Sequence, residues 1–191
     1  MFRPIHFMPR RACAALFAGL LACGCSAGQA DSAPDAAPST FVAFVPDFAG
    51  FRTWPSTPGV GPDGAPQPPS GDGGIHSGPL TTYINRPPPS GSTSFPVGTI
   101  IVKEPTTPPL SQRAIFAMVK RGGGFNLNGA TDWEWFELQS VDETNVAIVW
   151  RGAVPPAGES YGAVSSICND CHTMARSNDF VWTAGLALSS F

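Results

Sequence analysis

The stretch Cys168-Asn169-Asp170-Cys171-His172 brings two thiols and an imidazole together at the spacing of a c-type haem attachment site. The thiols lie one helical turn apart, so both can form thioether bonds to the two vinyl groups of one porphyrin. The adjacent His172 then points at the iron as an axial ligand. The motif predicts one covalently bound haem c per chain, with Cys168 and Cys171 binding the cofactor and His172 binding the metal.

The other interpretations of this motif are a structural zinc site, a redox-active thiol pair and a simple disulfide. Zinc needs four ligands, and beyond the N-terminal leader the chain offers only Cys168, Cys171, His172 and the distant His76. A thioredoxin-like pair is expected near a βαβ pattern, whereas this motif follows a run of apparent strands. A disulfide between the two cysteines stays open, and haem is the favoured interpretation.

The second axial ligand decides what the iron can do. Met174 follows His172 too closely to reach the opposite haem face, which leaves His76 and Met118 as candidates. A solvated loop histidine and a core methionine are the favoured interpretations of these two residues. We therefore expect an open distal site, which implies binding of or chemistry on a small molecule. A six-coordinate electron carrier is the alternative.

Composition and charge exclude some partners. The 191 residues suit one domain plus a leader, and 21 glycines with 21 prolines indicate many turns. The formal net charge is −3, and removing the three leader residues Arg3, Arg10 and Arg11 leaves −6. An acidic mature chain argues against nucleic acid or an anionic membrane surface as a partner.

Residues 1–25 have the pattern of a secretory signal peptide. A basic start over residues 1–11 precedes an apolar run over residues 12–22, which is too short to span a bilayer. A buried core helix is the alternative. The context of Cys23 and of Cys25 resembles a bacterial lipobox, and cleavage after Ala30 by the ordinary signal peptidase is the other option.

Residues 26–40 are too poor in apolar side chains to fold, so we expect a flexible tether. The sequence thus predicts a periplasmic lipoprotein of a Gram-negative bacterium, anchored in the outer membrane only through its N-terminal lipid.

Residues 41–191 are expected to form an α+β, mainly β domain, a curved antiparallel sheet with peripheral helices. Short connections imply antiparallel neighbours, since parallel strands need long crossovers. The expected strands, rich in β-branched and aromatic residues, are 80–85, 99–104, 114–120, 133–139 and 145–150. A Pro/Gly-rich loop covers 55–74, a haem-attachment helix 158–171 and a closing segment 178–191.

Residues 41–54 are expected to open the fold as a short helix or extended segment. The spacing of Phe44, Phe48 and Phe51 fits one helical face, for which core packing is the default explanation.

The order of motifs resembles the cytochrome P-460 family, which includes the cytochromes c′-beta. The resemblance runs from Phe51 to Thr183. Its matching stretches are Phe51-Arg52-Thr53-Trp54-Pro55, Tyr83-Ile84-Asn85, Phe95-Pro96-Val97-Gly98-Thr99-Ile100-Ile101-Val102-Lys103-Glu104, Ala117-Met118-Val119-Lys120, Asp132-Trp133-Glu134-Trp135, the haem motif and Asn178-Asp179-Phe180-Val181-Trp182-Thr183.

The resemblance implies an antiparallel β fold, usually dimeric, with a c-type haem. In some members the iron oxidises hydroxylamine and a lysine is cross-linked to the macrocycle. In others the haem binds nitric oxide or carbon monoxide beneath a cap of phenylalanines. The loop at 55–74 looks longer than the family norm, and Pro87-Pro88-Pro89 replaces a stretch that is usually helical.

The resemblance also suggests residue roles. Lys103 is the candidate for the cross-link, with Lys120 as second choice, and a strand lysine that pairs with a carboxylate or faces solvent is the alternative for Lys103. Hydroxylamine oxidation needs a base, for which Glu104 and Asp132 are candidates, and Arg86 could hold an anionic intermediate or product. A surface charge is the ordinary explanation for each carboxylate. The candidates for an apolar distal cap are Phe95, Phe116 and Phe125, and ordinary core packing is the favoured interpretation of all but Phe95.

Trp133 and Trp135 alternate with Glu134. Both tryptophans should therefore face the haem or core side of the sheet, with Glu134, another candidate base, on the opposite side.

Together these observations predict an exported mono-haem c-type cytochrome that acts on a small nitrogen compound such as hydroxylamine and passes electrons to another cytochrome. A non-catalytic binder of nitric oxide or carbon monoxide is the alternative. The chain is expected to form a homodimer.

Overall fold

The computed structural model describes residues 40–58, 79–107, 109–153 and 167–191, all within the unit Ala36–Phe191. The signal peptide, residues 26–39 of the tether and both candidate lipidation cysteines lie outside the described residues. So do His76 and residues 59–74 of the Pro/Gly-rich loop. In the described ranges, no helix is long and apolar enough to cross a membrane.

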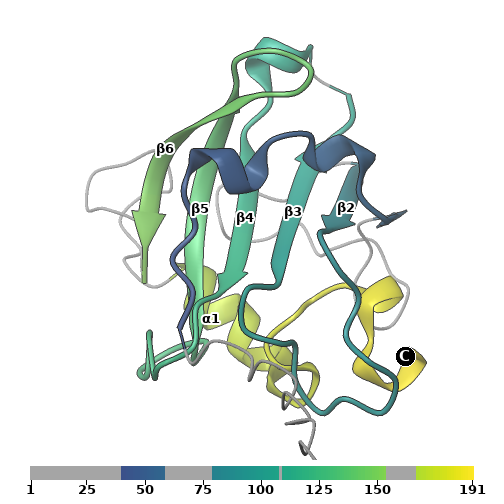
Figure 1. Cartoon of the computed structure of the whole chain (residues 1–191), viewed down its shortest axis with the longest axis vertical. Coiled ribbons are helices and arrows are strands. Elements are labelled where there is room, and N and C mark those ends of the chain that lie inside the picture. The colour runs from purple at the N-terminus through teal and green to yellow at the C-terminus, as the bar shows by residue number, and fades with distance from the viewer. Residues whose placement is uncertain (1–39, 59–78, 108, 154–166) are drawn as a thin grey trace, which may run out of the picture. The chain divides into compact units, whose positions relative to one another are not determined.

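Six strands form one antiparallel sheet in which every strand pairs with the next one along the chain (Figure 1). The strands are β1 (Ser56–Pro58), β2 (Leu80–Ile84), β3 (Ile100–Pro105), β4 (Ile115–Lys120), β5 (Trp133–Ser140) and β6 (Val146–Gly152). The predicted mainly β, antiparallel class is confirmed. The five predicted strands are present with bounds within two residues of expectation, and β1 was missed because three residues carry no readable alternation.

The sheet has two differently covered faces. The N-terminal face, as we name it, carries side chains that pack against the segment before β1. Its buried strand residues are Ile100, Val102, Ile115, Ala117, Val119, Phe136, Leu138 and Val146. The C-terminal face packs against the segment after β6. Its buried strand residues are Ile84, Ile101, Met118, Trp133 and Trp135.

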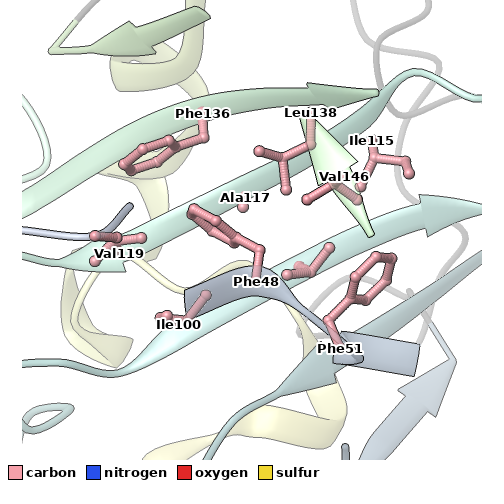
Figure 2. Packing of buried hydrophobic residues seen from close by; sticks show 11 residues of the cluster. Phe48, Phe51, Ile100, Ile115, Ala117, Val119, Phe136, Leu138 and Val146 are labelled. Carbon is pink, nitrogen blue, oxygen red and sulfur yellow. The ribbon is translucent and has the colours of Figure 1, made fainter. Parts of the chain in front are cut away.

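Two short 3₁₀ helices, η1 (Val45–Phe48) and η2 (Phe51–Thr53), cover the N-terminal face. Phe48 and Phe51 are completely buried and point into the strand side chains (Figure 2). Phe44 is 62% exposed, so its predicted place on the same buried helical face is wrong. The two turns are separate because Gly50 adopts a left-handed conformation (φ 68°) between them, which ends any common helical face.

The C-terminal face is covered by the end of the chain. The segment contains α1 (Ile167–His172) and three 3₁₀ turns, η4 (Thr173–Asn178), η5 (Ala184–Leu186) and η6 (Leu188–Ser190), which follow α1 in yellow in Figure 1. A further turn, η3 (Leu110–Gln112), precedes β4. The C-terminal end of the predicted haem-attachment helix coincides with α1, while residues 158–166 lie outside the described residues. The side chain of Asn178 ties this segment together through hydrogen bonds with Val181, Leu186 and Leu188.

Candidate functional site

Helix α1 holds the three chemically active side chains of the motif against the C-terminal face. Cys168 and Cys171 are half-buried and form no disulfide, and Cys168 packs against the apolar cluster of that face. His172 is 7% exposed, and its ring centroid lies 4.6 Å from that of Trp135 on β5. One short helix therefore presents two thiols and an imidazole from the same side of the sheet.

The tautomer of His172 follows from its hydrogen bond. Its Nδ1 lies 2.7 Å from the carbonyl oxygen of Phe180. A carbonyl can only accept, so Nδ1 carries the hydrogen and the lone pair is on Nε2. Burial, assisted by the positive charge of Lys103, lowers the pKa of His172 to about 3 against the opposing effect of the Phe180 hydrogen bond. The imidazole is therefore neutral at pH 7, the form in which histidine binds iron.

Lys103 on β3 extends into the same region. The side chain is buried on the C-terminal face, and its Nζ donates a hydrogen bond of 2.8 Å to the carbonyl oxygen of Trp182. Burial lowers the pKa of Lys103 to about 7, partly offset by attraction to Cys171. Lys103 interacts electrostatically with both Cys171 and His172, so the structure brings the predicted lysine near these two residues of the motif.

Asn169, inside the motif, fixes α1 to the sheet and was not singled out from the sequence. Its Oδ1 accepts hydrogen bonds from Asn126 Nδ2 (2.8 Å), Ala130 N (3.2 Å) and Trp135 Nε1 (3.0 Å). Its Nδ2 donates to Asn126 Oδ1 and to Ala153 O, both at 3.1 Å. This single buried amide positions the helix on which the two cysteines and the histidine lie.

Glu104 lies on the face of the sheet opposite to His172, although it was a candidate catalytic base. It follows Lys103 on β3, and successive strand residues face opposite sides. Its carboxylate is 2% exposed and accepts hydrogen bonds from Arg52 (2.8 Å) and Arg113 (3.1 Å). This cluster has a structural role on the N-terminal face, so we do not retain Glu104 as a catalytic candidate.

The other two candidate catalytic residues hold loops. Arg86 is exposed and donates a hydrogen bond of 2.6 Å to the carbonyl oxygen of Val97. Asp132 has a left-handed conformation (φ 72°), and its carboxylate accepts a hydrogen bond of 2.8 Å from Gly124 N. The catalytic roles of Arg86 and Asp132 stay predictions.

The predicted alternation along β5 is confirmed. Trp133 and Trp135 belong to the cluster on the C-terminal face, whereas Glu134 is bound by Arg121 (3.0 Å) and Arg151 (2.8 Å). Glu134 is therefore held away from His172, like Glu104.

Lys120, the second candidate for a cross-link, is engaged elsewhere. Its Nζ lies 2.7 Å from the carboxylate of Asp179 and 5.1 Å from the ring of Trp133. Lys103 therefore remains the better candidate.

The candidate cap residues occupy different places. Phe95 is 1% exposed and packs edge-on against Trp133, with ring centroids 5.9 Å apart. Phe125 lies under the guanidinium group of Arg121 at 4.4 Å. Phe116 is half-buried and pairs in register with Lys103, which places it beside that lysine on the sheet.

Met118 and Glu137 also lie on the C-terminal face. Met118 is 4% exposed within the apolar cluster, as expected for a core methionine. Glu137 pairs in register with Phe116 and Trp150, which puts a half-buried carboxylate on the C-terminal face. The sequence signal for Glu137 was the alternation that already places Trp133 and Trp135 on that face.

The side chains on α1 are compatible with the predicted covalent haem. Among the residues that the structure describes, no group of three or more His, Cys, Asp and Glu could hold a metal ion. Two separate thiols one turn apart and a neutral imidazole with its lone pair on Nε2 are what covalent haem attachment requires.

No protein-family model, no curated protein and no solved structure matches this chain. The resemblance to the cytochrome P-460 family therefore stays a prediction based on the order of its motifs.

Proposed function

We propose that the chain is an exported c-type cytochrome that carries one haem and acts as an oxidoreductase on a small nitrogen compound such as hydroxylamine. Cys168 and Cys171 would hold the haem, and His172 would be the axial ligand. The observation that carries this proposal is that the buried Lys103 amine and the buried His172 imidazole lie on the same face of the sheet, against which Cys168 also packs.

The residues around the motif have definite tasks in this proposal. The haem, when bound, supplies a redox-active iron with a position for a small ligand. The carbonyl of Phe180 fixes the tautomer of His172 and strengthens it as a donor. Trp135 packs against the imidazole and limits its rotation. Asn169 holds α1 in place so that the three side chains keep their relative positions.

Lys103 supports the catalytic branch of the cytochrome P-460 resemblance. With a pKa of about 7, roughly half of its side chains carry a neutral, nucleophilic amine at neutral pH. A bond from Nζ to a macrocycle carbon would replace one N–H and one C–H bond, with two electrons passing to an oxidant such as hydrogen peroxide. In the family that the chain resembles, such a cross-link accompanies hydroxylamine oxidation.

The test is expression of the full chain in a host competent for cytochrome c maturation. Intact mass should increase by one haem, and the Cys168→Ser and Cys171→Ser variants should lose covalent attachment. A protein recovered colourless with both thiols titratable would overturn the haem assignment.

The cross-link and the activity are tested on the same material. Peptide mapping should find Lys103 joined to the haem, and Lys103→Arg should shift the Soret band of the reduced protein and abolish hydroxylamine-dependent reduction of an added acceptor. Glu104→Gln is the matched control, because it changes the next residue of β3 on the opposite face. Haem bound only through two thioethers would remove the cross-linked enzyme.

Binding of nitric oxide or carbon monoxide without turnover is the second candidate, and Phe116 favours it. This half-buried phenylalanine lies in register with Lys103 on the C-terminal face and adds apolar surface beside the site. Carbon monoxide binding by a protein that gives no hydroxylamine-dependent reduction would select this function.

The partners and location follow from the same proposal. We infer a periplasmic, lipid-anchored homodimer that passes electrons to another cytochrome. Retention in the outer-membrane fraction, and release after substitution of both Cys23 and Cys25 by serine, would test the anchor.

A further inference from the structure

The turn at Asp179 and Phe180 has an unusual backbone conformation. Both residues are left-handed, with φ of 50° and 66°, respectively. This region is uncommon for any residue except glycine, and for a bulky phenylalanine it is a clear outlier. Such a conformation persists only where surrounding contacts determine it, and it often occurs at functional sites.

The carbonyl group of this strained turn is the one that accepts the hydrogen bond of His172. Phe180 O lies 2.7 Å from His172 Nδ1. The turn is closed by hydrogen bonds from Phe180 N to Ala175 O (2.9 Å) and from Val181 N to Asn178 O (3.0 Å). The direction of the carbonyl, and therefore the tautomer of His172, depends on what fixes the turn to the sheet.

Asp179 makes that attachment with its side chain and its backbone. Its Oδ1 accepts a hydrogen bond from Lys120 Nζ at 2.7 Å, and its Oδ2 accepts one from Phe95 N at 2.8 Å. Its carbonyl oxygen accepts a third from Trp133 Nε1 at 2.8 Å. The side chains of Lys120 and Asp179 are 7% and 9% exposed, so their ion pair is shielded from water.

We propose that Asp179 is the positioning residue for His172. By tying the left-handed turn to β4, β5 and the segment before β3, Asp179 aims the Phe180 carbonyl at Nδ1. The consequences for the iron rest on the proposed function, whereas the fixed tautomer of His172 does not.

The inference predicts a change in the iron's redox equilibrium. A histidine ligand whose other nitrogen donates a strong hydrogen bond is a better donor and favours the ferric state. Loss of the Asp179 anchor should weaken that bond. We expect at least a tenfold shift toward the ferrous state, which corresponds to a rise of about 59 mV in the reduction potential for a one-electron couple.

Asp179→Asn is the principal variant, because asparagine keeps the shape and tolerates left-handed backbone while removing the charge. Lys120→Met is the second variant, since it removes the ion pair and leaves Asp179 in place. Glu134→Gln is the matched control, because it removes the negative charge of another buried side chain with cationic partners, on the N-terminal face.

The measurements are the reduction potential and the iron–histidine stretching frequency of the haem-bound full chain. Both should change in Asp179→Asn and, in the same direction, in Lys120→Met, and stay unchanged in Glu134→Gln. A shift of the iron's redox equilibrium below twofold, which is about 18 mV in the reduction potential, in both test variants would overturn the proposal. An equal change in Glu134→Gln would also overturn it, because the effect would then report general loosening. If Asp179→Asn does not fold, Lys120→Met decides.

Failure of the proposed function can be recognised separately. If the purified wild-type chain contains no haem by mass and spectrum, the haem assignment fails, and the role of Asp179 is then read from the nitrogen NMR shifts of His172 in the full chain. Protonation at Nδ1 in the wild type, and a mixture of tautomers in Asp179→Asn, would support the role. The same tautomer in both would overturn it.

Discussion

Replacement of Asn169 by aspartate should detach α1 from the sheet with little change in side-chain volume. The substitution converts Nδ2, which donates hydrogen bonds to Asn126 Oδ1 and Ala153 O, into an oxygen. Asn126 Oδ1 and Ala153 O then face an oxygen that cannot donate a hydrogen bond to either of them. Asn126 cannot relieve this by rotating its amide, because its Nδ2 also donates to Ala130 O and Trp133 O, both at 3.2 Å.

The magnitude follows from the number of affected bonds. Each buried acceptor that loses its donor costs about 1–3 kcal/mol, so two give about 2–6 kcal/mol. The three bonds to Oδ1 become charge-assisted and return part of this, while burial of a carboxylate at a 7% exposed position adds a further cost. We expect a net loss of about 3 kcal/mol, a large fraction of the roughly 5–15 kcal/mol by which domains are stable.

Urea unfolding followed by far-ultraviolet circular dichroism measures this loss. With a slope of about 1.5–2 kcal/mol per molar urea, the midpoint of Asn169→Asp should fall by about 1.5–2 M. Asn128→Asp is the matched control, because Asn128 is exposed in the same loop as Asn126 and should change stability by less than about 0.5 kcal/mol. If Asn169→Asp differs from Asn128→Asp by less than about 1 kcal/mol, Asn169 does not anchor α1.

Three other predictions concern Gly129, Glu104 and His172. Gly129→Ala should cost about 1–3 kcal/mol in thermal unfolding, because the added Cβ would overlap the side-chain amide of Asn169; an unchanged melting temperature would contradict that packing. Glu104→Gln should lower the free energy of unfolding in urea by about 3 kcal/mol, because it leaves Arg52 and Arg113 beside a neutral group. The variant should keep the haem spectrum of the wild type. A changed spectrum would indicate that Glu104 acts at the haem site. His172 stays neutral to about pH 3 in the folded protein but takes a proton near pH 6.5 in the unfolded chain. The free energy of unfolding of the haem-free chain should therefore fall by about 3 kcal/mol between pH 7 and pH 4. An equal fall in the His172→Gln variant would exclude this cause.

The strands could be predicted from the sequence because their information is local. Residues 100–105, 115–120 and 133–140 combine β-branched and aromatic residues with turn residues on both sides. Their short connections required an antiparallel order, which the structure confirms. The helical interpretation of Phe44 failed because three correctly spaced phenylalanines do not reveal the interruption at Gly50.

The supports of the candidate site could not be predicted in this way, because they join distant parts of the chain. Asn169 pairs with Asn126, which lies 43 residues earlier, and Asp179 binds the backbone of Phe95, 84 residues earlier. Neither asparagine nor aspartate shows from its type alone that every polar atom of its side chain will be engaged in hydrogen bonds. The motif identified the reactive side chains, while its supports depend on the register of the sheet.

Lys103 and Glu104 show that residue type alone does not say which face of the sheet a charged side chain occupies. They are neighbours on β3, yet the alternation of the strand sends them to opposite faces. On the N-terminal face, Glu104 is bound by two guanidinium groups, which hold the carboxylate in an ion-pair cluster. On the C-terminal face, burial lowers the pKa of both Lys103 and His172, so it favours uncharged nitrogen bases beside the thiols. An electron-rich amine and a neutral imidazole are the forms that bond formation and iron ligation need, and the same desolvation produces both.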